Sequence, residues 1–152
     1  MDQREFEAIM NDATKRIDGT IDWGDDEDHS PALEFKAKVE SDAGWPILVK
    51  GSYNPKIGAL SYTIIHRGAG RICALDLGKD HHNPTCQNVG EKHRHNWTNE
   101  FRDKVADAAL HITASASDPI EVWKQFCADC KIMHNGMMHP PTRPAEQRDF
   151  FE

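Results

Sequence analysis

The segment 33–40 constrains the fold more than any other part of this chain. Its residues alternate between apolar and charged side chains: Leu33, Phe35, Ala37 and Val39 with Glu34, Lys36, Lys38 and Glu40. Because successive side chains of a β-strand point to opposite faces of a sheet, this alternation predicts a strand. One face of the strand meets a core and the other meets water.

Further strands are expected at close spacing along the chain. The apolar segments 46–53, 60–66 and 71–77 are separated only by turn residues at 54–58 and 68–70. Connections this short favour an antiparallel meander, because parallel pairing needs a crossover of about a dozen residues. A fifth strand is expected at 92–97.

Helices are expected on both sides of the strands. Apolar residues recur at helical spacing over 3–18, where Asp2 can cap the helix. Two C-terminal helices are expected at 98–112 and from Asp118 to about Ile132. This order predicts an α+β fold: an antiparallel four- to five-stranded meander sheet with an N-terminal helix and two C-terminal helices on one face. A single domain is expected over 1–134, with an irregular or mobile tail at 135–152.

The charge distribution bears on the class of partner. The formal net charge is -7, and the segment Asp22–Asp28 holds five acids (Asp22, Asp25, Asp26, Glu27 and Asp28) without a base. A non-specific grip on nucleic acid needs a basic stripe, so broad nucleic-acid binding is disfavoured. A site for one phosphate group remains compatible with this charge. So does an inhibitor or adaptor that uses Asp22–Asp28 to bind a basic host or defence-system protein.

The location is predicted from two absences in the sequence. There is no run of about 18 apolar residues that would span a membrane. The N-terminal segment is amphipathic and charged, unlike a secretory signal. We therefore expect a cytoplasmic protein with no membrane contact.

Histidines are concentrated between 81 and 95. His81 and His82 precede Asn83, while His93 and His95 are spaced so that both rings lie on one face of the expected strand. Imidazole titrates near neutrality, ligates metals and transfers protons. Asp76, at the end of the preceding strand, can orient a histidine by accepting its second ring N–H.

The hypothesis that we favour from the sequence is metal-free chemistry on RNA or a nucleotide. His95 and His93 would act as acid and base, and His82 would be a third participant. Lys50 and Arg71 would neutralise charge on the phosphate oxygens. Such a protein would be a small effector that binds or cleaves its ligand, as a metal-independent ribonuclease or phosphodiesterase, without a cofactor.

Two other interpretations of the histidines stay open. In the first, His82, His93 and His95 hold zinc in a zinc-binding domain, with Cys86 considered as the fourth ligand. In the second, the histidines make ordinary surface hydrogen bonds. Cys127 and Cys130 are less attractive as zinc ligands, because their helical spacing is typical of buried thiols.

The middle of the chain, residues 47–106, resembles a family of small uncharacterised prokaryotic and phage proteins. The resemblance rests on Leu75-Asp76-Leu77-Gly78, on His82-Asn83-Pro84, on Gly90, His93, His95 and Trp97, and on Lys50 and Tyr53. It implies a shared site around His82, Asn83, His93 and His95, and it adds Asn83, Asp76, Tyr53 and Trp97 as candidate substrate-binding residues. The family has no function to carry over.

This chain departs from the family pattern at two places. Thr85-Cys86 stands where the family has Asp-Gly, which weakens Cys86 as a ligand. Arg94 and Asn96 replace apolar residues, so we expect the strand face opposite His93 and His95 to be exposed or bound to a partner.

Overall fold

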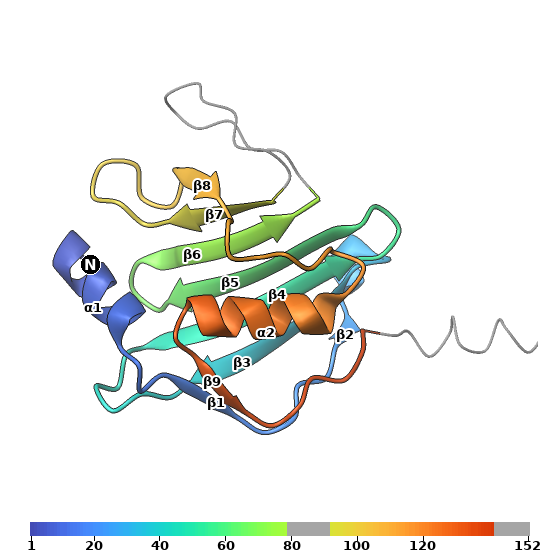
Figure 1. Cartoon of the computed structure of the whole chain (residues 1–152), viewed down its shortest axis with the longest axis horizontal. Coiled ribbons are helices and arrows are strands. Elements are labelled where there is room, and N and C mark those ends of the chain that lie inside the picture. Colours follow the sequence, from blue (N-terminus) through green and yellow to red (C-terminus); the bar gives the residue numbers. More distant parts are fainter. Residues whose placement is uncertain (79–91, 142–152) are drawn as a thin grey trace, which may run out of the picture.

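The computed structural model describes residues 1–78 and 92–141, and its main element is a seven-stranded antiparallel sheet (Figure 1). The strands pair in chain order: β2 (Gly24–Asp25), β3 (Leu33–Val39), β4 (Ile47–Asn54), β5 (Ala59–His66), β6 (Gly70–Leu77), β7 (Lys92–Asn96) and β8 (Ala106–Ala108). The remaining elements are α1 (Gln3–Asn11), η1 (Glu27–His29), α2 (Pro119–Asp129) and a parallel pair, β1 (Arg16–Asp18) with β9 (Met133–Asn135). The predicted antiparallel α+β architecture is confirmed, whereas the numbers of strands and helices differ.

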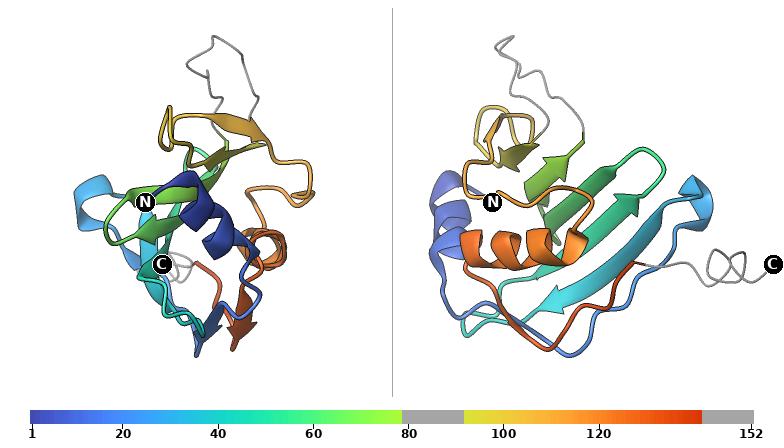
Figure 2. Two further views of the ribbon diagram at one scale, coloured as in Figure 1. Left: turned by 90° about the vertical axis from the view of Figure 1, so that its left-hand side faces the viewer. Right: turned by 45° about the vertical axis from the view of Figure 1, so that its right-hand side comes forward.

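The helix α2 covers one face of the sheet, which we call the α2 face. The Tyr62 hydroxyl donates to the carbonyl oxygen of Pro119 at 2.7 Å, and the Trp123 ring meets the Phe35 ring edge-on at 5.6 Å. Since side chains alternate along each strand, the neighbours of Phe35 and Tyr62 point to the other face, which we call the open face. The segment around η1 lies on that side of the sheet (Figure 2, left).

The N-terminal helix ends at Asn11 rather than near residue 18, so this part of the helix prediction is wrong. The Asp12 carboxylate accepts hydrogen bonds from the main-chain N–H and the hydroxyl of Thr14, an arrangement that competes with helix. The buried Lys15 ammonium then donates to the carbonyls of Ile9, Met10 and Asp12. These bonds satisfy the C-terminal carbonyls of α1, and the chain continues into β1.

The helix predicted at 98–112 does not form. Thr98 does cap a turn, since its hydroxyl accepts from the N–H of Phe101, but Arg102 then takes a left-handed conformation with φ of 56°. The chain returns as β8, which pairs with β7 through Ala106, Asp107 and Ala108. Main-chain bonds to the edge of β7 therefore outweigh the local helical pattern.

The second C-terminal helix is confirmed as α2. The Asp118 side chain accepts from the N–H of Glu121, and Pro119 occupies the first turn, as the sequence predicts. Residues 135–141 also contact the rest of the described chain. The N–H of His139 donates to the carbonyl of Ile21 at 2.9 Å, and Met138 is buried.

The strand face opposite His93 and His95 is covered by α2, contrary to the expectation of an exposed or partner-bound face. Arg94 forms an ion pair with Asp129 in the last turn of α2 and donates to Asn96.

The thiols of Cys73, Cys127 and Cys130 are buried and form no disulfide with one another, and burial was predicted for Cys127 and Cys130. Within the described residues, neither helix is long and apolar enough to cross a membrane.

Candidate functional site

A row of polar residues crosses the open face from strand to strand. The sheet register places them directly opposite one another in the order Glu34, Ser52, Ser61, Asp76 and His93. A second row, two residues along each strand, contains Lys36, Lys50, Thr63 and His95. The alternation that buries one face of these strands therefore gathers polar groups on the other.

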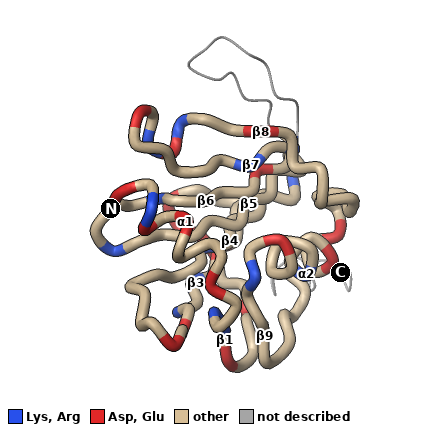
Figure 3. Tube along the Cα trace, turned by 60° about the vertical axis from the view of Figure 1, so that its left-hand side comes forward, with Lys and Arg blue, Asp and Glu red and all other residues tan. Residues whose placement is uncertain are grey.

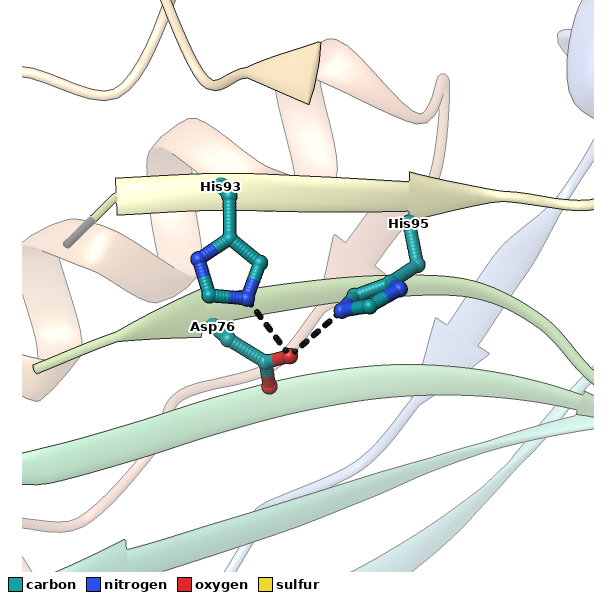
Figure 4. A group of neighbouring side chains, drawn as sticks. All are labelled: Asp76, His93 and His95. Carbon is teal, nitrogen blue, oxygen red and sulfur yellow. Dashed lines mark ion pairs between the residues drawn. The ribbon is translucent and has the colours of Figure 1, made fainter. Parts of the chain in front are cut away.

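At the β6–β7 end of these rows, two imidazoles converge on one carboxylate oxygen (Figure 4). The Nε2 atom of His93 lies 3.3 Å from Oδ2 of Asp76, and the Nε2 atom of His95 lies 3.2 Å from the same oxygen. The side chains of the two histidines are 3% and 5% exposed, while that of Asp76 is 17% exposed. The cluster is thus nearly enclosed, and Asp76 is its most accessible member.

The main chain of Asp103 fixes the orientation of the His95 ring. Nδ1 of His95 lies 2.8 Å from the Asp103 carbonyl oxygen, which can only accept, so Nδ1 carries the proton of this bond. In a neutral ring, Nε2 would then present a lone pair to the Asp76 carboxylate. Two electron-rich atoms at this separation need a cation between them, either a second proton on His95 or a metal ion.

Asp76 is held in its ionised form. Burial alone would raise its pKa, but hydrogen bonds from His95 and Ser61 and the charge of the two histidines lower the pKa to about 2. The Ser61 hydroxyl donates to Oδ1, which leaves Oδ2 directed at the histidines. Asp76 is therefore a carboxylate with one oxygen fixed by the protein and one available to a cation.

A metal ion fits this cluster. Among the described residues, Asp76, His93 and His95 each offer one ligand atom, and these three atoms lie within 4.8 Å of one another. Two atoms that each lie about 2.1 Å from a tetrahedral ion are about 3.4 Å apart, close to the observed separations from Asp76. Two imidazoles and a carboxylate suit zinc and other divalent transition metals.

A cleft of about 330 Å³ opens beside Asp76 on the open face. Its floor includes Lys50, Ser52 and Ser61, and its far wall is formed by Asp26 and His29 of the η1 segment. The Lys50 ammonium lies 3.6 Å from the Glu34 carboxylate. Because Asp76 belongs both to the cluster and to the lining, the cleft borders the cluster.

The structure brings four of the predicted site residues together: His93, His95 and Asp76 in the cluster, and Lys50 in the adjoining cleft. Arg71 takes a different place, since its guanidinium binds the carboxylate of Asp103 at 2.6 Å and so supports the residue that holds His95. His82 and Asn83, together with His81 and Cys86, lie outside the described residues.

Two of the predicted substrate-binding residues do not reach the cleft. Tyr53 pairs with Leu33 and Leu60 on the α2 face, where its ring lies 6.3 Å from that of Trp23. Trp97 is buried against Phe6 of α1, with the Arg102 guanidinium over its ring. These contacts show that both rings pack into the interior.

Sequence reasoning missed several residues of the site. Ser52 and Ser61 each lie at an open-face position of a correctly predicted strand, so the alternation itself was a signal for them. Asp26 and His29 come from a segment more than sixty residues before His93, and no local pattern connects them with the histidines. Asp103 follows His95 by eight residues, but it lies in the segment that was predicted as a helix. Lys and Arg are interspersed with Asp and Glu along the described chain (Figure 3), which agrees with a local site rather than a basic stripe.

The fold and the cluster define an α+β protein with an enclosed two-histidine, one-carboxylate group on the sheet face opposite α2. The chain belongs to a family of unknown function, DUF6978, whose model matches residues 1–132. The resemblance to an uncharacterised family is thereby confirmed, over a longer stretch than 47–106. No curated protein and no solved structure matches the chain.

Proposed function

We propose that this protein acts on phosphate esters, as a binding protein or phosphoesterase, with a divalent metal ion held by Asp76, His93 and His95. Zinc is the first candidate. The observation that supports the proposal is that the Nε2 atoms of His93 and His95 both lie close to one oxygen of Asp76, at 3.3 and 3.2 Å. The proposal keeps the histidines and the phosphate-ester ligand of the sequence-based hypothesis and adds the metal.

The three ligands that the described residues supply favour chemistry over a purely structural role. Catalytic zinc sites have three protein ligands and one position for water or substrate, whereas structural sites have four protein ligands. In hydrolysis, the oxygen of water bonds to phosphorus, the ester P–O bond breaks, and a hydrogen ends on the released alcohol oxygen. The metal would polarise the phosphoryl group, and Lys50 would offset charge on its oxygens.

Metal titration tests the proposal directly. Protein stripped with a chelator should bind about one equivalent of zinc, and His93→Ala and His95→Ala should each weaken zinc binding at least about a hundredfold. His139→Ala is the matched control, because His139 pairs with Asp22 at an exposed position and should leave zinc affinity unchanged. A wild-type protein that binds no divalent metal would overturn the proposal.

Activity assays separate the metal-dependent and metal-free mechanisms. Phosphodiester and phosphomonoester substrates are tested with chelator and with zinc restored. Turnover or ligand binding should disappear with chelator and return with zinc. Turnover that persists in chelator and is lost in His95→Ala would support the metal-free acid and base pair instead.

A structural zinc site makes a different prediction for residues 79–91. If His82 or Cys86 supplied a fourth ligand, His82→Ala or Cys86→Ser would weaken zinc binding as strongly as His95→Ala. Our proposal expects both variants to retain zinc affinity within about threefold, and a larger loss would favour the structural site.

The exposed acidic segment supports a second candidate function, an inhibitor or adaptor that binds a basic partner. Asp25, Glu27 and Asp28 are exposed, and Asp22 is 69% exposed in its side chain. Replacing Asp25, Glu27 and Asp28 by their amides leaves Asp26 of the cleft intact. If these changes abolish the effect of the protein in cells while His95→Ala does not, the inhibitor function replaces the phosphate-ester function.

A further inference from the structure

The cleft beside Asp76 contains groups that the metal site does not use. Lys50 lies on its floor, and its ammonium is 3.6 Å from Glu34, with the two side chains 37% and 35% exposed. Ion pairs of this length and exposure contribute little to stability. The Lys50 ammonium is therefore available to an anion that enters the cleft.

With a divalent ion in the cluster, this end of the cleft would attract an anion. The two positive charges of the ion and that of Lys50 exceed the two negative charges of Asp76 and Glu34 by one. A phosphate monoester carries about -1.5 to -2 at neutral pH and presents three acceptor oxygens, so one such group can contact both the metal and Lys50. The site is therefore suited to a terminal phosphate group.

The opposite wall presents groups suited to hydroxyls and to a ring. The Asp26 carboxylate accepts from the N–H of Asp28 and from the His29 ring, and its side chain is 12% exposed. A carboxylate held in this way can accept from sugar hydroxyls or an exocyclic amino group. Ile57, which is 64% exposed, provides an apolar surface at the rim against which a flat ring can pack.

From these groups we infer that the cleft binds a nucleoside monophosphate. Its phosphate lies between Lys50 and the metal, and its sugar and base extend toward Asp26, His29 and Ile57. The inference rests on the proposed metal function and names its ligand class. The volume of about 330 Å³ falls at the lower end of small-ligand sites, so the cleft accommodates one nucleotide rather than an RNA chain.

The test uses isothermal titration of the zinc-loaded protein. The probes are the four common ribonucleoside monophosphates, ribose 5-phosphate, inorganic phosphate and a five-nucleotide RNA without a terminal phosphate. At least one nucleoside monophosphate should bind about tenfold or more tightly than inorganic phosphate, because the far wall adds contacts. Ribose 5-phosphate should fall between them.

Variants of two lysines assign the binding to the cleft. Lys50→Gln should weaken nucleoside monophosphate binding about tenfold or more and leave zinc affinity unchanged. Lys38→Gln is the matched control: Lys38 forms an exposed ion pair with Glu40 at 3.4 Å and does not line the cleft, so binding should be unchanged. Asp26→Asn should weaken nucleoside monophosphates but not inorganic phosphate.

The outcomes distinguish this inference from the metal proposal. Zinc binding without nucleoside monophosphate binding overturns the inference and leaves the metal site intact. Nucleoside monophosphate binding that is unaffected by Lys50→Gln, or RNA binding that is at least about tenfold tighter, also overturns it. Failure to bind any divalent metal contradicts the proposed function itself.

Discussion

His95 and Asp103 are joined by a hydrogen bond of 2.8 Å between an imidazole Nδ1 and a main-chain carbonyl oxygen. The carboxylate of the same Asp103 accepts from Nε of Arg71 on β6 at 2.6 Å. A candidate metal ligand on β7 is thus oriented by the turn that follows it, and that turn is tied to the neighbouring strand. Outer contacts of this kind fix the direction in which a histidine presents its second nitrogen.

The first prediction concerns Arg71. Arg71→Gln removes the charged partner of Asp103, so the Asp103 carbonyl is held less firmly and the His95 ring loses its fixed orientation. Zinc affinity should fall about tenfold, in the range observed when outer-shell partners of metal ligands are removed. Competition with a chromogenic chelator measures this change.

A second arginine provides the control for that prediction. Arg16 pairs with Asp42 at 3.3 Å on an exposed part of the surface. Arg16→Gln should leave zinc affinity unchanged. Equal affinities for Arg71→Gln and the wild type would mean that Asp103 does not position His95.

The second prediction concerns the packing of Phe35 against Gly51 on the α2 face of the sheet. Gly51 on β4 is paired with Phe35 on β3, and a methyl group at Gly51 would lie 1.9 Å from Cε2 of the Phe35 ring. Gly51→Ala should therefore lower the free energy of unfolding by about 2–3 kcal/mol, because the ring must leave its position over the glycine. Urea denaturation followed by tryptophan fluorescence measures the loss.

Gly24 is the matched control for Gly51. It also lies in a strand, but the nearest atom to an added methyl group is the Glu34 carbonyl oxygen at 3.9 Å. Gly24→Ala should change the unfolding free energy by no more than about 0.5 kcal/mol. A Gly51→Ala protein as stable as Gly24→Ala would show that Phe35 moves aside at no cost.

The strands β3 to β6 could be predicted from the sequence because each carries its signal locally. Residues 33–39 alternate in polarity, and the short connections up to β6 favour antiparallel neighbours, so the order and pairing of these four strands follow from the sequence. The shared face of His93 and His95 follows from the same alternation. The approach of Asp76 to both rings depends on register between β6 and β7, which no local pattern sets.

Where the sequence prediction was wrong, contacts distant in the chain decide the structure. Residues 98–112 have helical spacing, yet β7 takes residues 106–108 as its neighbour. Residues 12–18 continue an apolar repeat, yet Lys15 closes α1 and β1 pairs with β9, more than a hundred residues away. Propensity is a weak preference, and main-chain pairing of this kind overrides it.

The third prediction concerns thiol reactivity. Burial raises the pKa of the Cys127 thiol to about 12, and Cys73 and Cys130 are fully buried with their sulfur atoms 4.0 Å apart. Since the thiolate is the reactive form, a Cys86→Ser protein should show almost no reaction with Ellman's reagent at pH 7.5 in its native state. All three remaining thiols should react in denaturant, and rapid native labelling of any of them would contradict their burial.

The last prediction is a pH dependence at the end of α1. Hydrogen bonds from the hydroxyl and N–H of Thr14 lower the pKa of Asp12 below its ordinary value of 3.8, and the Trp45 indole N–H adds a further bond at 2.8 Å. A carboxyl group with a lowered pKa in the folded state stabilises the fold above its unfolded pKa, and this contribution is lost as the pH falls through the folded value. The stability difference between the wild type and Asp12→Asn should therefore be largest above about pH 5 and shrink below about pH 4. Urea unfolding at a series of pH values measures this stability difference.

The variant Thr14→Val provides the control for this prediction. In that background the stability difference between the proteins with and without Asp12→Asn should depend less on pH, because the hydrogen bonds that lower the pKa of Asp12 are weakened. An unchanged pH dependence would mean that another group causes it.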